Sequence, residues 1–192
     1  MDKNSARASE GVAVAVLVVA GIVGLLGYRS CMAMKMDPAS ARRLATITLP
    51  GGVSFQAQQD AFLYNLAHFL ADTADTGVPK TFIFDELNFD SGTTTLTAAS
   101  GETVTRLTSV LAAYPAVNVL LVGYADSTGD LAANRALSLA RAKTVAELLA
   151  RNGVAPGRMG TDGKGEENPV ASNETEEGRA RNRRLELVVT KK

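Results

Sequence analysis

Two charged residues, Asp126 and Arg141, have side chains that together could hold a ligand carrying both an amine and a carboxylate. Asp126 ends the strand-like run AVNVLLVGYAD (116–126), and Arg141 follows inside a helical pattern of small and apolar residues. A fixed carboxylate binds an ammonium group, and a planar guanidinium binds a carboxylate through two parallel hydrogen bonds. From the pattern alone we favour a structural ion pair between them, which at the surface would contribute only about 0 to 1 kcal/mol.

Other kinds of chemistry find little support in the sequence. The stretch DSTGD supplies Asp126 and Asp130, but a calcium loop needs more oxygen ligands at regular spacing. The single cysteine, Cys31, excludes an internal disulfide and a Cys-rich zinc site, and no nucleophile motif accompanies His68. We therefore expect no metal, no cofactor and no catalysis, and we interpret Asp130 as the N-cap of the following helix.

The elements that must position Asp126 and Arg141 alternate from residue 80 onwards. The order β-α-β-α-β-β predicts an α/β (α+β) two-layer sandwich with both helices on one face of the sheet. Asp126 would then lie at the carboxyl end of a central strand, where loops converge into a pocket, with Asn134, Leu137 and Arg141 facing it from the helix. The predicted elements are strand 80–90, helix 97–115, strand 116–126, helix 129–153, a short strand or turn 157–165, a polar loop 166–182 and strand 183–190.

An extension precedes these elements, at residues 45–78. Two β-rich pieces flank Pro50-Gly51-Gly52 and predict a hairpin. The segment DAFLYNLAHFLADT places its large apolar residues on one helical face, with Asp60 as the cap, and a break follows at Gly77 to Pro79. We expect this helix to pack its apolar face against the domain at 79–192.

The segment 11–28, between a tail at 1–10 and a linker at 29–44, carries no charge. As a helix it would extend about 27 Å, close to the hydrocarbon thickness of a bilayer. We interpret it as a transmembrane helix, and a cleaved signal or a lipid-attachment site at Cys31 remain open. More Lys and Arg residues follow the segment than precede it, which by positive-inside counting favours a cytoplasmic body.

Composition limits the partners of the chain. Its 192 residues suit one ordinary domain, and its 20 basic and 20 acidic side chains cancel. This balance gives no electrostatic reason to expect nucleic acid. Trp is absent and aromatic residues make up 5%, so the core must be built mainly from aliphatic side chains.

Residues from about Lys80 to Thr190 resemble the OmpA-like domain, the peptidoglycan-binding module of bacterial envelope proteins. The resemblance rests on four motifs in family order: LNFDSG (87–92), LLVGYADSTGD (120–130), ANRALSLARAKTVAELL (133–149) and GKGEENPVASNETEEGRARNRRLEL (163–187). It implies that Asp126 and Arg141 hold the diaminopimelate residue of the peptidoglycan stem peptide. The predicted ligand-binding set is Asp126, Arg141, Asn134, Asp90, Ser91, Ala125 and Leu137, with Phe89 in the same loop.

The sequence departs from the family in one motif, because the family often has His-Thr-Asp where this chain has Tyr124-Ala125-Asp126. Loss of the threonine hydroxyl would remove a hydrogen bond to the ligand and lower its affinity. Arg183 and Arg184 match the family's NRR motif, and we expect them to anchor the last strand and its loop.

The resemblance implies non-catalytic peptidoglycan binding that tethers a bacterial membrane to the cell wall. Peptidoglycan lies in the periplasm, so the body should lie there despite the charge count. We favour an inner-membrane anchor, with an outer-membrane lipoprotein or a secreted protein as alternatives. The alternative is an envelope scaffold or a motor- or secretion-associated interaction protein. In that case the OmpA-like domain would be structural, would bind no ligand, and would contact another envelope protein. A motor stator would need an ionisable residue in its membrane segment, and 11–28 has none.

Overall fold

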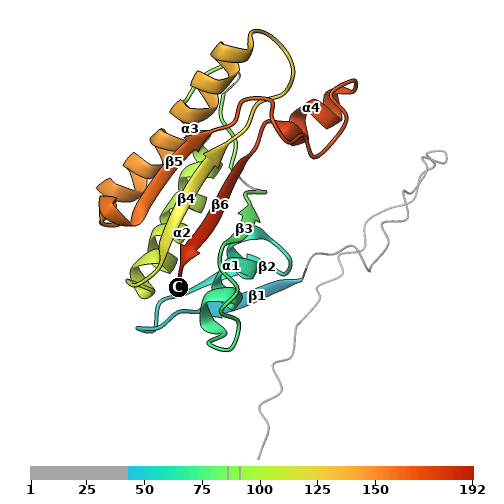
Figure 1. Cartoon of the computed structure of the whole chain (residues 1–192). Helices are drawn as coiled ribbons and strands as arrows, with labels where there is room; N and C mark the ends of the chain where they lie inside the picture. Colours follow the sequence, from blue (N-terminus) through green and yellow to red (C-terminus); the bar gives the residue numbers. More distant parts are fainter. Residues whose placement is uncertain (1–42, 86, 91) are drawn as a thin grey trace, which may run out of the picture. The chain divides into compact units, whose positions relative to one another are not determined.

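The computed structural model describes residues 43–85, 87–90 and 92–192 (Figure 1). These residues form a four-stranded sheet, a separate two-stranded hairpin and four α-helices. In chain order the elements are β1 (Leu44–Thr48), β2 (Ser54–Gln58), α1 (Phe62–Ala71), β3 (Lys80–Ile83), α2 (Ala98–Ala113), β4 (Asn118–Gly123), α3 (Leu131–Arg151), the 3-10 turn Pro156–Arg158, β5 (Met159–Gly163), α4 (Glu176–Asn182) and β6 (Leu185–Lys191).

The larger sheet has the strand order β3-β6-β4-β5. The last strand, β6, lies between β3 and β4 and runs antiparallel to both, whereas β4 and β5 are parallel. The helices α2 and α3 lie on the same face of this sheet (Figure 1). The mixed α/β layering expected from the sequence is therefore present.

The core of the domain contains every second side chain of the two inner strands, β4 and β6. Val119 and Leu121 on β4 pair with Val189 and Leu187 on β6, and all four are at most 3% exposed. Leu120, between the two core residues of β4, is only partly buried because alternate side chains of a strand point to opposite faces. This pattern directs one face of the sheet to the helices.

The N-terminal extension shares this core. β1 and β2 form the predicted antiparallel hairpin, and Gly51 and Gly52 adopt the positive φ angles that the turn requires. From α1, Phe62 stacks on Phe84 with ring centroids 4.0 Å apart, and Phe69 lies against Phe82 of β3. The apolar face of α1 therefore packs inward, as expected.

The predicted cap of α1 is wrong. Asp60 has a φ of 71° and lies before the helix, which begins at Phe62 with Ala61 at the N-cap position. The carboxylate of Asp85, just after β3, accepts from the Phe62 amide at 3.3 Å instead. An acid distant in the sequence thus accepts from a backbone amide of the first helical turn, and a search for local capping residues does not detect such a contact.

The predicted polar loop at 166–182 is also wrong in part, because it contains α4. Thr175 caps this helix by accepting from the Gly178 amide. Glu176 and Glu177 occupy its first turn, and basic residues occupy its last. Acidic residues at the start and basic residues at the end stabilise a short helix through its dipole. This pattern could have predicted α4 from the sequence.

The predicted membrane segment at 11–28 and all but the end of the linker at 29–44 lie outside the described residues. Within residues 43–85, 87–90 and 92–192, no helix is long and apolar enough to cross a membrane.

The predicted cap of α3 is confirmed, because the Asp130 carboxylate accepts from the Ala133 amide at 2.9 Å. Replacing Asp130 by Ala leaves that amide without its partner at the positive end of the helix dipole. We expect the free energy of unfolding to fall by about 1 kcal/mol. Urea unfolding followed by circular dichroism measures the change, and an Asp130→Asn variant should lose less because it keeps an acceptor oxygen.

Candidate ligand-binding site

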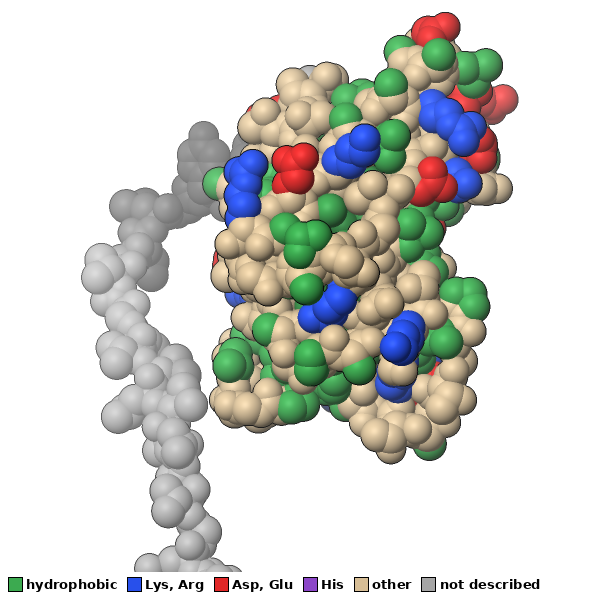
Figure 2. All heavy atoms as spheres, turned by 60° about the vertical axis from the view of Figure 1, so that its left-hand side comes forward, with side chains coloured by type: hydrophobic (Ala, Val, Ile, Leu, Met, Phe, Trp, Pro, Cys, Tyr) green, Lys and Arg blue, Asp and Glu red, His purple; other side chains and the backbone are tan. Residues whose placement is uncertain are grey.

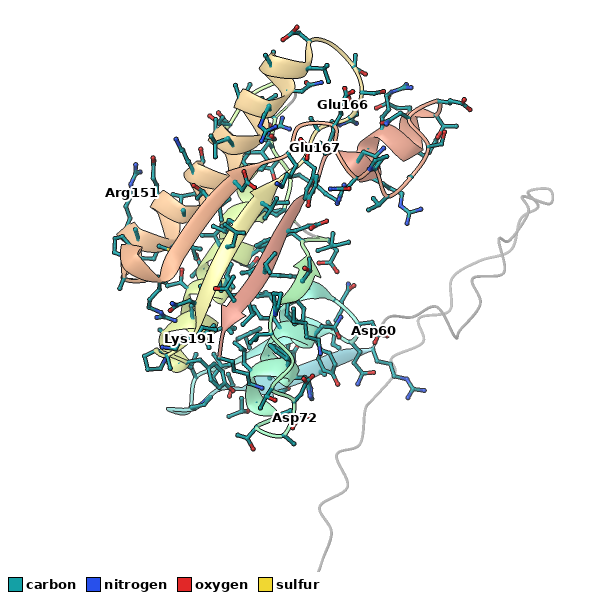
Figure 3. All side chains as sticks on the ribbon, viewed as in Figure 1. Asp60, Asp72, Arg151, Glu166, Glu167 and Lys191 are labelled. Carbon is teal, nitrogen blue, oxygen red and sulfur yellow. The ribbon has the colours of Figure 1, made fainter. Side chains whose placement is uncertain are left out.

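A pocket of about 770 Å³ opens where β4 ends and the loops around it meet. Asp126 follows β4, and α3 and the segment from α4 to β6 supply further walls. Glu166 and Glu167, on the loop from β5 to α4, lie at this end of the molecule, whereas Lys191 and Asp72 lie at the other (Figure 3). The lining residues are Leu87, Asn88, Phe89, Gly92, Ala125, Asp126, Thr128, Asn134, Leu137, Arg141, Glu176, Arg179, Ala180, Arg183, Arg184 and Leu185.

The position of α3 depends on a close approach to β4. A Cβ atom on Gly123 would lie 2.1 Å from the backbone oxygen of Ser138, so only glycine fits there. Ser138 is buried, and its hydroxyl accepts from the Gly165 amide at 3.0 Å. This contact holds the helix against the end of β4, with Asn134 and Arg141 on either side of Ser138.

Asp126 is buried, with 8% of its surface exposed, and its carboxylate has two partners. One oxygen accepts from the Thr128 amide at 2.8 Å, and the other accepts from Nη1 of Arg183 at 2.6 Å. Burial acts to raise the pKa of Asp126, but the hydrogen bonds from Arg183 and Thr128 outweigh it and hold that pKa below its ordinary value. The carboxylate is therefore ionised at neutral pH.

Arg141 is equally buried, but no described residue forms an ion pair with it. Its Nε donates to the backbone oxygen of Thr93 at 2.9 Å, and its guanidinium lies 5.0 Å from the centre of the Phe89 ring. Burial and the charge of Arg183 lower the pKa of Arg141, while Asp126 opposes this shift. A guanidinium still remains protonated at neutral pH, so a cation faces the pocket.

The structural ion pair that the pattern alone favoured is not formed. Among the ion pairs of the described residues, Asp126 is joined to Arg183 and none joins it to Arg141. Asp126 and Arg141 thus lie in one pocket as two separate charges.

The other predicted residues divide into three groups. Asn134, Ala125 and Leu137 line the pocket with Asp126 and Arg141, and the Asn134 amide donates to the backbone oxygens of Asp126 and Thr128. Asp90 is exposed and does not line it. Its backbone instead forms a turn with Thr93 and Thr95. Ser91 lies outside the described residues.

The two arginines of the NRR motif have different surroundings. The side chain of Arg184 is only 6% exposed, pairs with Glu186 at 2.8 Å and lies 3.8 Å from the Tyr124 ring centre, which is the anchoring role expected for it. Arg183 lines the pocket and contacts both Asp126 and Glu176. The expectation that Arg183 only anchors the last strand is therefore incomplete.

The wall that sequence reasoning missed comes from α4, with Glu176, Arg179 and Ala180. Among the described residues, the pocket lining consequently has four arginines, Arg141, Arg179, Arg183 and Arg184, against two acids, Asp126 and Glu176. This excess of positive charge favours a ligand that carries a carboxylate.

The fold and the pocket together define a two-layer α/β domain that presents a charged ligand pocket at one end of its sheet. The profile of the OmpA family matches residues 88–183, half of the sequence, and the chain belongs to this family.

Relatives share this half of the chain. The probable lipoprotein YiaD of Escherichia coli is 43% identical over 106 residues, which are 55% of this chain and 48% of YiaD. The peptidoglycan-binding protein ArfA of Mycobacterium tuberculosis is 45% identical over 101 residues, 53% of this chain and 31% of ArfA. The chain thus spans about half the length of YiaD and about a third of ArfA.

Solved structures agree with this assignment. The cell wall anchor of the type VI secretion system from Pseudomonas aeruginosa is 35% identical, with a TM-score of 0.51 over 66% of this chain and 97% of the anchor. The periplasmic domain of Helicobacter pylori MotB has a TM-score of 0.53 at 22% identity, over 61% of this chain and 75% of that domain, and shares the fold.

Proposed function

We propose that this domain binds peptidoglycan without catalysis, by holding the diaminopimelate residue of the stem peptide between Asp126 and Arg141. The side chain of diaminopimelate ends in an ammonium and a carboxylate on one carbon. The observation that carries the proposal is the presence of a buried anion and a buried cation in one pocket without an ion pair between them.

Each charge suits one end of this ligand. Asp126 is ionised at neutral pH and accepts the ammonium. Nε of Arg141 donates a hydrogen bond to the backbone oxygen of Thr93. Among the described residues, none accepts a hydrogen bond from the two Nη groups of Arg141. Two parallel Nη donors match a carboxylate, and a ligand anion would relieve the burial of this cation.

The site lacks the threonine that the family often has at residue 125. Ala125 is buried in the lining and offers no hydroxyl, while its backbone amide donates to the Gly165 oxygen at 2.7 Å. One hydrogen bond to a charged ligand contributes about 1.5 to 3 kcal/mol. We therefore expect weaker binding than in relatives that have the threonine.

We place the domain in the periplasm of the bacterial cell envelope, tethered to the inner membrane. Relatives named as lipoproteins or outer-membrane proteins keep an outer-membrane location as the alternative. On the face turned forward in Figure 2, the described basic and acidic side chains form small separate groups, so this face offers nucleic acid no continuous basic surface.

A second candidate is an envelope scaffold whose domain is structural. The 35% identity to a type VI secretion anchor favours an association with a larger envelope assembly. The ion pair of Asp126 with Arg183 also favours it, since the anion of the site is already partnered. In this case residues 40–78 would contact another envelope protein.

The test compares peptidoglycans that differ only at the proposed contacts. Sacculi of the diaminopimelate type should sediment with the protein, whereas sacculi with acetylated amines lack the ammonium for Asp126, and lysine-type sacculi lack the carboxylate for Arg141. We expect at least about a tenfold loss of bound protein for each modified wall. Equal sedimentation with all three walls would exclude the clamp and favour the scaffold.

A further inference from the structure

The carboxylate on which the proposed function depends already has a cationic partner. Nη1 of Arg183 lies 2.6 Å from Oδ2 of Asp126, and the other carboxylate oxygen is held by the Thr128 amide. We propose that Arg183 is a latch, a cation that occupies the position beside Asp126 that a ligand ammonium would take and must leave Asp126 when a ligand binds. The latch rests on the proposed function and adds to it a residue that determines which ligands are accepted.

Space at Asp126 favours competition over shared binding. Its side chain is only 10% exposed, so little of the carboxylate is open to a third partner. The oxygen toward Thr128 is taken by the backbone of its own loop, and the oxygen toward Arg183 is taken by a residue that lines the pocket. A ligand ammonium therefore reaches the carboxylate best where Arg183 now lies.

A second acid gives Arg183 somewhere to remain after it is displaced. Nη2 of Arg183 lies 2.8 Å from the carboxylate of Glu176, at the start of α4. Arg183 is 38% exposed and Glu176 64%, so their pair can shift without opening the core. Figure 1 shows α4 projecting beyond the end of the sheet.

This arrangement sets two conditions for a ligand. It must bring an ammonium that competes with a guanidinium for Asp126, and it must bring a carboxylate for Arg141. A dicarboxylate meets only the second condition and cannot release the latch. A latch that is closed for most of the time lowers the apparent affinity by the fraction of open sites.

The test uses the full-length chain in detergent and titration calorimetry with two probes of the same carbon skeleton. One is meso-diaminopimelate, and the other is pimelate, which lacks both amines. In Arg183→Gln the latch is absent, so meso-diaminopimelate should bind roughly threefold to tenfold more tightly. Pimelate gains nothing from a free Asp126 and loses one pocket cation, so it should bind no more tightly than to wild type. Arg135→Gln, which removes the same charge from an exposed site outside the pocket lining, should match wild type for both probes.

A double-mutant cycle tests whether Glu176 acts through Arg183. Glu176→Gln removes the alternative partner of Arg183, so the single variant should bind meso-diaminopimelate more weakly than wild type. In the double variant the loss caused by Glu176→Gln should be smaller than in the single variant, because the part of it that acts through Arg183 is gone.

Three results would overturn the latch. Weaker binding by folded Arg183→Gln would mean that Arg183 positions Asp126 or contacts the ligand itself. Unchanged binding by that variant, with wild type still binding, would reject the latch and leave the clamp intact. If neither protein binds meso-diaminopimelate, freeing Asp126 has exposed no site, and the clamp and the latch both fail.

Discussion

Replacing Arg141 by Ala is expected to weaken binding to diaminopimelate-type peptidoglycan about a hundredfold or more while the domain stays folded. The change removes the only cation of the pocket that, in the described part of the chain, has no acidic partner. It also leaves the ligand carboxylate buried and unpaired, a loss that typically costs about 2 to 5 kcal/mol. Sedimentation of wild type and variant with purified sacculi over a range of protein concentrations measures the change.

Asp126→Asn is the companion variant, because it keeps the shape of the side chain and removes the charge that accepts the ammonium. A comparable loss of binding is expected. Circular dichroism and thermal unfolding serve as controls, since Arg141 also contacts Phe89 and the Thr93 backbone. Wild-type binding by both folded variants would show that the two charges are not the clamp.

A methyl group on Gly123 is expected to destabilise the domain by about 3 kcal/mol or more. The added Cβ atom of Gly123→Ala would lie 2.1 Å from the backbone oxygen of Ser138 and 2.7 Å from its carbonyl carbon. Both are main-chain atoms of α3, so the helix must move away from β4 and lose packing along its length. Urea unfolding followed by circular dichroism measures the loss, and ligand binding should fall with it because Arg141 moves too.

Gly101→Ala is the matched control for this substitution. Gly101 lies in α2, and a Cβ atom there would meet nothing within 4 Å. Alanine in an open helical position should stabilise the domain by about 0.5 to 1 kcal/mol. Equal stability of the two alanine variants would contradict the close approach of α3 to β4.

The sequence was sufficient to predict the elements with long periodic patterns. The helix at 129–153 and the strand at 116–126 appear as α3 and β4 with shorter ends. Seven-residue α4 was missed because it has too few turns to show an apolar face, and its only signals are the Thr175 cap and the order of its charges. The Asp85 contact with the start of α1 was beyond reach, since it joins residues 23 positions apart.

The part of the candidate site that comes from neighbouring elements of the chain could be predicted from the sequence. Asp126 follows β4 and Arg141 lies on α3, the next helix, so their meeting follows from the βα connection. Arg183 is 57 positions from Asp126, and its contact depends on α4 and on the path of the chain into β6. Pairing of this kind is decided by tertiary structure, and a pattern of residue types in the sequence does not specify it.

The central place of β6 in the sheet affects when this domain can begin to fold. β6 is synthesised after all other strands, yet it separates β3 from β4 and supplies Leu187 and Val189 to the core. Until it emerges from the ribosome, β3 lacks its partner in the sheet and β4 can pair only with β5, so the sheet remains divided. The sheet of a domain with this topology can therefore be completed only after almost the whole domain has been synthesised.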